Sequence, residues 1–411
     1  MQIGKGSEAT RRSVLAGGIG LATTLASGSV RAAPIGVKIG AIMPSSGVLA
    51  FPGQACVRGI DLGVKFAKEH YGIDITVIHG DTQSKPENGR IVAENLIRQG
   101  CTVLIGAWDS GATISALQAC EAAKVPMVVH IASATQVTSQ GFTQVFRFYP
   151  TSLTLIRQSL EELKAIIANL NDPPRSMAVM HLNNTFGQSS GASISQAWGE
   201  LQVPIKVTET IAYDEKARDL SVEVAKAKAS GADSLLSVTR VNDAIMIARE
   251  CIKQGWNPKM VFSPNSNGIQ DKAYYEALGK YAEGPISAVI WLNPKSPYTG
   301  RITKQFQADY PKDGWMDANA GCAFEAVQIA SDAIVRAKSC VPTDIHAALK
   351  TTDMTPILMN CGGNIMFDAS GQNKSSAATI LQAQGLGPKV VAPKTISEAS
   401  LIYPLPPYGS R

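Results

Sequence analysis

The stretch GAWDSGAT at residues 106–113 connects an apolar run, residues 101–105, to a run with helical character at residues 114–123. An apolar run of this length is typical of a buried strand, so the stretch predicts a turn from a strand into a helix. The first N–H groups of such a helix lack backbone partners and lie at the positive end of the helix dipole. With the Ser110 hydroxyl beside them, they favour a site for a carboxylate or another acceptor-rich ligand. An ordinary helix cap by Ser110 or Asp109 is the alternative.

The same alternation extends on both sides of this turn. Strands are expected at residues 36–43, 73–79, 102–105 and 125–129, and helices at residues 54–70, 86–99 and 114–123. Strands and helices that alternate over short loops predict a parallel sheet with helices on both faces. Ligands of such sheets bind beyond the carboxyl ends of the strands, which here are followed by loops 44–47, 80–81, 107–113 and 130–133.

A second alternating series begins after residue 150. Strands are expected at residues 176–182, 203–208, 233–238 and 260–262, and helices at residues 188–201, 219–230 and 242–254. Segments 285–292, 300–310 and 318–338 then complete one of the sheets. The predicted fold class is therefore α/β, with two doubly wound, Rossmann-like lobes that face each other across a cleft.

The N-terminus has the pattern of an export signal. Arg11 and Arg12 precede an apolar run at residues 14–26, and small residues near Ala32 follow. This run is shorter than a membrane-spanning helix and has signal-peptide flanks, and the paired arginines resemble a twin-arginine signal. We expect residues 1–32 to be a twin-arginine-type signal peptide and the mature protein to be periplasmic, with no membrane-spanning segment.

Composition excludes several function classes. The formal net charge is +5, and residues 1–32 carry four basic residues and one acidic residue, a net +3, so about +2 remains after cleavage. No basic stripe with interleaved aromatic residues is present, so a nucleic-acid partner is not expected. The seven cysteines and five histidines lack the spacing of a zinc site, so neither a metal nor a cofactor is predicted.

Motifs for catalysis are missing from the sequence. It contains no Gly-x-Ser-x-Gly elbow, no phosphate loop that ends in Gly-Lys-Ser/Thr and no His-Glu-x-x-His. Asp109 beside Ser110 suits a hydrolase only if a histidine joins them, which leaves a hydrolase as a remote alternative. The sequence predicts a binding protein and not an enzyme.

Several weak marks, in one order and spacing, together resemble a known family. They are VKIGAIMPSSG at residues 37–47, Gly80-Asp81 with Pro86, residues 106–113, Ala132-Ser133, Asn183-Asn184 before Phe186-Gly187, and GNIMFD at residues 363–368. With the leader, they resemble the periplasmic substrate-binding proteins of branched-chain amino-acid-type ABC transporters. The resemblance implies a Leu/Ile/Val-binding-protein-like, type I periplasmic binding fold with three crossings between the lobes.

In that family two loops of the first lobe hold the ligand's carboxylate and amine. By resemblance, those loops here contribute Trp108, Asp109 and Ser110, and Ile131, Ala132 and Ser133. Serine hydroxyls and N–H groups at helix starts suit this role. Phe51 is a candidate for an apolar lid, and Trp108 is either a ligand contact or a core aromatic residue.

The second lobe is expected to close on the ligand through Phe186, Arg240 and Asn265. The family commonly has Tyr where Phe186 and Arg240 stand, and an acidic residue where Asn265 stands. A neutral amide and an added cation favour an acid or an amide over a zwitterionic aliphatic amino acid. Asp109 is an alternative partner for an ammonium group, and a solvated surface charge is the alternative for Arg240.

The resemblance also implies lobe boundaries. Lobe 1 is expected to comprise residues 33–149 and 285–356, and lobe 2 residues 150–284 and 357–411, with crossings near residues 148–152, 283–287 and 355–360. Cys340 and Cys361 flank a short predicted helix near the last crossing, and we predict a disulfide between them. Closing a loop of this size would stabilise the folded state by about 3 kcal/mol.

The expected function is capture of a small amino acid, amide or carboxylic acid for an ABC importer. The expected partners are this ligand and the importer's permease and ATPase, and we expect the binding protein to be a monomer. A periplasmic sensor that reports to a kinase or chemoreceptor fits the same sequence.

Overall fold

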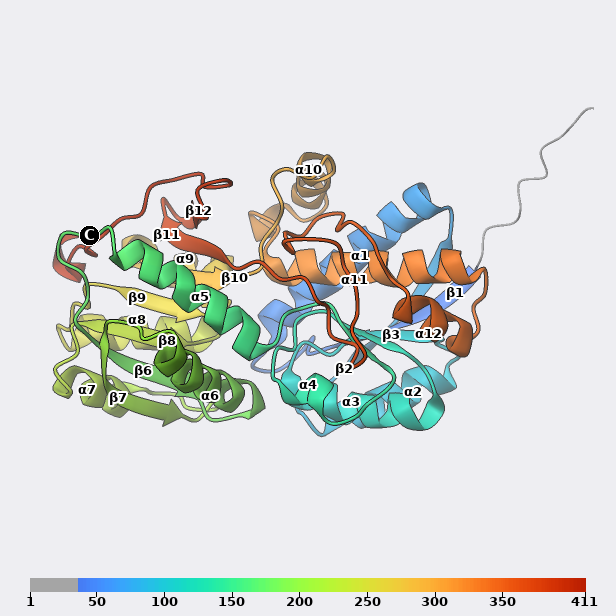
Figure 1. Cartoon of the computed structure of the whole chain (residues 1–411), viewed down its shortest axis with the longest axis horizontal. Helices are drawn as coiled ribbons and strands as arrows, with labels where there is room; N and C mark the ends of the chain where they lie inside the picture. Colours follow the sequence, from blue (N-terminus) through green and yellow to red (C-terminus); the bar gives the residue numbers. More distant parts are fainter. Residues whose placement is uncertain (1–35) are drawn as a thin grey trace, which may run out of the picture. The chain divides into compact units, whose positions relative to one another are not determined.

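The computed structural model describes residues 36–411 and contains two β-sheets (Figure 1). The first sheet has five parallel strands in the order β2-β1-β3-β4-β5. Its strands are β1 (Gly36–Met43), β2 (Asp74–Asp81), β3 (Val103–Gly106), β4 (Met127–Val129) and β5 (Val145–Arg147). This doubly wound order confirms the predicted fold class for the first lobe.

Helices cover both faces of the first sheet because its central strands are apolar on both faces. Leu104 packs with α2 (Asn88–Arg98) and α3 (Ser110–Ala123), whereas the adjacent Ile105 packs with α1 (Ala50–Tyr71) and α11 (Ala318–Ala337). A Cβ at Gly59 of α1 would lie 2.1 Å from the Ala320 carbonyl oxygen, so glycine is needed where α1 and α11 meet. The lobe also contains α4 (Gln136–Ser139), α10 (Thr299–Asp309), η3 (Pro311–Asp313) and α12 (Pro342–Lys350).

The second sheet has seven strands in the order β12-β11-β10-β9-β8-β6-β7. They are β6 (Ser176–Leu182), β7 (Lys206–Tyr213), β8 (Ser234–Val238), β9 (Val261–Pro264), β10 (Ile286–Val289), β11 (Thr379–Gln384) and β12 (Gly387–Ala392). The strands from β6 to β10 are parallel, and β11 and β12 join antiparallel at one edge. Two doubly wound sheets therefore form the protein, as the sequence predicts.

Helices also flank the second sheet on both faces. On one face, α5 (Ser152–Ile167) and α6 (Thr185–Glu200) pack on the sheet, and on the other α7 (Ser221–Ala229) and α8 (Val241–Lys253). The shorter elements are η1 (Gly268–Gln270), α9 (Lys272–Leu278), η2 (Gly279–Ala282) and η4 (Tyr408–Ser410). Helix α5 is not among the helices expected above, although its buried residues recur at helical spacing from Ser152 to Ile167.

Three segments cross between the lobes, and two of them differ in place from the expectation. The first follows β5 and ends at α5, within the expected region 148–152. The second crossing follows β10, because β10 pairs with β9 and β11 and so belongs to the second sheet. The expectation that residues 285–289 belong to lobe 1 is therefore wrong.

The third crossing lies between Asn373 and β11 and not at residues 355–360. The Glu325 carboxylate of α11 accepts hydrogen bonds from the N–H groups of Ile357, Leu358 and Met359 at 2.8–3.0 Å, and a bridge joins Gln372 to Arg147. Residues 357–373 thus pack with the first lobe, so the expectation that they belong to the second lobe is wrong.

The predicted disulfide between Cys340 and Cys361 is absent from the structure. All seven cysteines lie among the described residues, and all are free thiols. Glu325 holds the segment before Cys361, whereas Cys340 follows the end of α11 at Ala337. The part of α11 between Glu325 and Ala337 is about 18 Å long at 1.5 Å per residue, so the two cysteines lie near opposite ends of this stretch, and a disulfide needs Cα atoms within roughly 7 Å.

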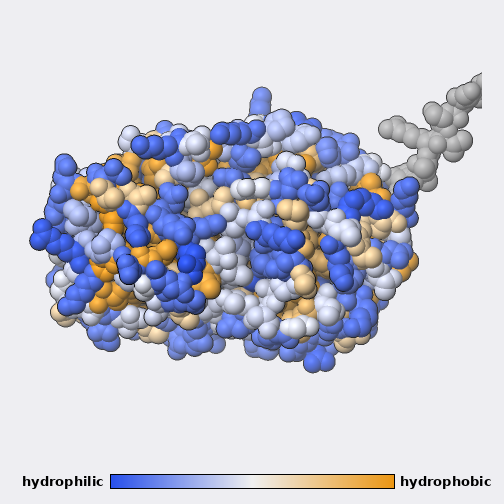
Figure 2. Space-filling view, viewed as in Figure 1, coloured by the Kyte–Doolittle hydropathy of each residue, from blue (hydrophilic) through white to orange (hydrophobic). Residues whose placement is uncertain are grey.

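The predicted signal peptide falls on residues 1–32, which lie outside the described residues. Within residues 36–411, no helix has the length and hydropathy needed to cross a membrane. Figure 2 shows hydrophobic residues interspersed among hydrophilic ones over the face it displays.

Candidate ligand-binding site

One cavity with an empty volume of about 370 Å³ lies between the two lobes. Each of its lining residues lies within four residues of the carboxyl end of a parallel strand, which is where open α/β sheets bind ligands. The first lobe contributes Trp108, Ser110, Ile131, Ser133 and Tyr149, and the second contributes Phe186, Thr239, Arg240, Asn265 and Asn267.

Seven of the nine residues predicted for the ligand site line this cavity. Asp109 does not, because it caps α3 by accepting from the Ala112 N–H at 3.0 Å and its other oxygen pairs with Arg240. Ala132 does not either, and its carbonyl accepts from the Arg147 guanidinium at 3.2 Å. Phe51 is exposed at the start of α1 and lines a separate hollow, so its prediction as the lid of this cavity is wrong.

Tyr149, Thr239 and Asn267 also line the cavity, and the sequence analysis missed them. Each follows a strand end, so the signal was present in the sequence. Tyr149 is not predicted because its segment has the pattern of a boundary between the two series, and not of a loop after a fifth strand.

Left-handed backbone conformations occur at two of the lining residues. The φ angle is 66° at Trp108 and 53° at Asn265. Such values are uncommon for residues other than glycine and cost free energy, above all for a bulky side chain. Asn tolerates this conformation, whereas the fold holds Trp108 in an unfavourable one beside the cavity.

Asn319 at the start of α11 holds cavity residues from both lobes. Its amide oxygen accepts from Trp108 Nε1 at 2.9 Å and from Asn267 Nδ2 at 2.8 Å. Its amide nitrogen donates to the Asp317 carboxylate at 2.7 Å. Asn319 is therefore a positioning residue behind the cavity, and only the three-dimensional structure reveals it.

Hydroxyl and amide groups from both lobes form a second cluster at the cavity. The Asn265 amide nitrogen lies 3.0 Å from Ser133 Oγ, 3.3 Å from Ser152 Oγ and 3.2 Å from Ser190 Oγ. Ser152 Oγ also donates to Ser133 Oγ at 3.2 Å. The cluster is neutral, so it can bind a carboxylate or carboxamide but supplies no anionic partner for an ammonium group.

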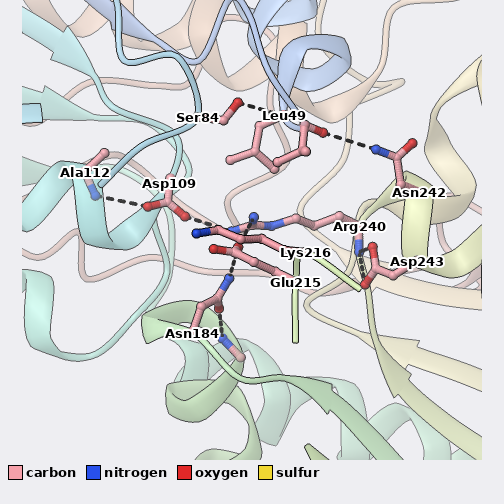
Figure 3. A network of polar contacts seen from close by, with 12 residues as sticks. Leu49, Ser84, Asp109, Ala112, Asn184, Glu215, Lys216, Arg240, Asn242 and Asp243 are labelled. Carbon is pink, nitrogen blue, oxygen red and sulfur yellow. Dashed lines mark hydrogen bonds and ion pairs between the residues drawn. The ribbon is translucent and has the colours of Figure 1, made fainter. Parts of the chain in front are cut away.

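Arg240 is buried between the carboxylates of Asp109 and Glu215 (Figure 3) and also lies against two aromatic rings. Its guanidinium pairs with Asp109 at 2.8 Å and with Glu215 at 3.0 Å. The guanidinium carbon lies 5.1 Å from the centre of the Trp108 ring and 5.7 Å from that of Phe186. The alternative of a solvated surface charge is wrong, since the Arg240 side chain is only 8% exposed.

The start of α8 fixes the backbone of Arg240. The Arg240 N–H donates to both oxygens of Asp243 at 3.0 and 3.1 Å, and Asp243 also accepts from the Tyr213 hydroxyl at 2.5 Å. Burial raises the pKa of Asp243 to about 6. These contacts aim the Arg240 side chain from the second lobe toward Asp109 of the first.

The cavity lining carries one charged residue, Arg240, and its charge is compensated by the two carboxylates. Burial raises the pKa of Tyr149 well above its ordinary value, so its phenol stays neutral. No histidine lines the cavity, and residues 36–411 contain no cluster of His, Cys, Asp and Glu suited to a metal ion.

Comparisons with known proteins agree with this geometry. The sequence profile of the periplasmic binding protein family matches residues 36–387. The Leu/Ile/Val-binding protein homolog 8 of Brucella suis biovar 1 is 22% identical over 384 residues, covering 89% of this chain and 93% of the relative. Homolog 1 of the same organism is 25% identical over 368 residues, covering 88% and 94%.

Solved structures share the fold at low sequence identity. The leucine-binding protein LivK of Thermotoga maritima has a TM-score of 0.75 and 20% identity, covering 87% of this chain and 98% of its own. LivJ of Streptococcus pneumoniae, in complex with isoleucine, has a TM-score of 0.75 and 18% identity, covering 87% and 99%. An ABC-transporter solute-binding protein of R. palustris, in complex with benzoate, has a TM-score of 0.75 and 16% identity, covering 87% and 96%.

Two doubly wound lobes joined by three crossings, with a cavity at the carboxyl ends of their strands, have the type I periplasmic binding fold. The profile match then assigns the chain directly: it belongs to the periplasmic binding protein family. The members of this family bind solutes and are not enzymes, which confirms the expectation from the missing catalytic motifs.

Proposed function

We propose that this protein is the extracytoplasmic solute-binding component of an ABC importer and delivers its ligand to the permease. The observation that carries the proposal is the cavity that five residues of each lobe line at the carboxyl ends of the strands. A ligand held by both lobes stabilises their contact, and the closed arrangement is what a permease can recognise. The Leu/Ile/Val-binding relatives support the same role.

The cavity favours a small carboxylic acid or amide with an apolar or aromatic body. Ser110, Ser133 and Asn265 offer hydroxyl and amide groups, while Trp108 and Phe186 offer aromatic surface. No acidic residue lines the cavity to pair with an α-ammonium group, and Asp109 is already paired with Arg240. This chemistry favours a ligand such as benzoate or a benzamide over a zwitterionic aliphatic amino acid.

Thermal shift and calorimetry with leucine, isoleucine, benzoate and benzamide test this proposal. A ligand at 100 times its Kd stabilises the folded state by about 2.7 kcal/mol, which raises the melting temperature measurably. We expect the acid or amide to bind more tightly than leucine. Phe186→Ala should weaken binding, and Phe51→Ala, at an exposed residue outside the cavity, is the matched control. Tighter binding of leucine would overturn the ligand class.

Export through the twin-arginine route is part of the same proposal. It rests on Arg11 and Arg12 before the apolar run. Replacement of both arginines by lysine should leave uncleaved precursor in the cytoplasm, as measured by cell fractionation and mass spectrometry. Unchanged export would overturn the route but not the binding function.

A further inference from the structure

Arg240 separates the ligand cavity from a second, larger hollow. An outer groove of about 1,290 Å³ lies between residues 48–52 of the first lobe and residues 215–218 and 240–249 of the second. The inner cavity has an empty volume of about 370 Å³. Arg240 is the one described residue that lines both hollows.

The Arg240 side chain is held on several sides, so it forms a fixed wall. Asp109 binds it from the first lobe and Glu215 from the second, and the rings of Trp108 and Phe186 lie against the guanidinium. Glu215 is itself fixed, because it accepts from Asn184 Nδ2 at 2.5 Å (Figure 3). A planar guanidinium with two carboxylate partners has little freedom to move aside.

One of the three nitrogens of the guanidinium makes no hydrogen bond to the described part of the protein. Arg240 Nε is buried and makes no hydrogen bond within residues 36–411. A longer ligand that displaced the side chain would leave Asp109 and Glu215 without their cation, which is costly at buried positions. The wall therefore resists ligands that extend beyond the inner cavity.

We propose that Arg240 is a specificity-determining residue whose guanidinium closes the inner cavity from the outer groove and thereby limits the length of the ligand. This inference rests on the proposed function, because it takes the inner cavity as the ligand site. Removal of the side chain joins the two hollows, so a ligand with an aromatic head in the inner cavity can extend into the outer groove.

The test compares Arg240→Ala with Arg240→Met, which removes the charge but keeps a long side chain. Binding of benzoate, 3-phenylpropionate and 4-phenylbutyrate is measured by calorimetry. In the wild type and in Arg240→Met we expect the affinity to fall with chain length. In Arg240→Ala the longest acid should gain about 10-fold or more relative to benzoate, about 1.4 kcal/mol. The same order of affinities in all three proteins would overturn the proposal.

A measurement without ligand separates this proposal from the proposed function. The measurement is the quenching of Trp108 fluorescence by acrylamide. Because the protein has five tryptophans, the signal of Trp108 is obtained by subtracting the fluorescence of the same variant with Trp108→Phe. Trp108 is 6% exposed, and Arg240→Ala should make it more accessible than Arg240→Met does. If quenching rises in Arg240→Ala but none of the acids binds, the ligand class is refuted while the role of Arg240 as a wall of the cavity is supported. Quenching that is equal in Arg240→Ala and Arg240→Met would refute that role. If Arg240→Ala does not fold, Arg240→Ser replaces it.

Discussion

Ser133 illustrates how a single residue can serve both the ligand and the contact between the lobes. Its hydroxyl lines the cavity and accepts from Asn265 of the second lobe at 3.0 Å. Ser133→Ala should therefore weaken ligand binding about 10-fold or more, because a hydrogen bond to a charged group contributes about 1.5–3 kcal/mol. Calorimetry measures this loss. Ser159→Ala, at a buried hydroxyl that bonds within α5 and does not line the cavity, should bind as wild type does. Equal affinities in both variants would contradict the assignment of Ser133.

At the residue scale, the sequence predicts side chains that follow strands but not the partners they find. Ser110, Ser133 and Asn265 were recognisable because each follows an apolar run closely. The pairing of Asp109 with Arg240 joins residues 131 positions apart, and no local pattern reveals it. Asn319 was missed for the same reason, since it contacts the cavity residues only after α11 has returned to the first lobe.

The residue that caps the N-terminus of α11 is a buried acid that should make stability depend on pH. Asp317 accepts from the Ala320 N–H at 2.9 Å, and burial raises its pKa from 3.8 to about 6. The folded state therefore holds this proton more tightly than the unfolded state. The resulting stabilisation is fully present below pH 3.8 and is lost as the pH rises through about 6. The difference corresponds to about 3 kcal/mol.

Asp317→Asn keeps a capping side chain and removes the titration. Urea unfolding at pH 4.5 and pH 7 should show that the free energy of unfolding of the wild type falls more steeply with pH than that of the variant. Other buried acids titrate in both proteins and cancel in the comparison. Parallel pH profiles would show that Asp317 stays ionised in the folded protein.

At the element scale, apolar runs predict the strands and helices well but not their place in the fold. The run at residues 285–292 was expected to complete one of the sheets, and it contains β10. Its hydrophobicity does not show which sheet it joins, and pairing with β9 decides this. Residues 357–373 posed the same difficulty, because their place depends on hydrogen bonds to the Glu325 carboxylate from a distant helix.

At the scale of the whole molecule, contacts between the lobes control access to the cavity. Thr135 of the first lobe donates its N–H to Ser189 Oγ of the second at 3.1 Å, and Asn242 Nδ2 donates to the Val48 carbonyl at 3.2 Å. Most residues that line the cavity are nearly inaccessible in this arrangement, with Ser133 2% and Asn265 4% exposed. A ligand can therefore enter or leave only when the lobes separate. Two lobes facing a cleft were predictable from two tandem series, but these contacts were not.

A disulfide across the lobes tests this requirement directly. In Thr135→Cys/Ser189→Cys the two thiols replace side chains on neighbouring backbone segments, and oxidation should lock the lobes together. Protein oxidised without ligand should bind none of the acids and amides that the reduced protein binds, and protein oxidised with ligand should retain it through dialysis. Reduction should restore exchange, and each single-cysteine variant should behave as wild type throughout. Exchange at the wild-type rate in the oxidised protein would mean that the ligand reaches the cavity while the lobes stay in contact.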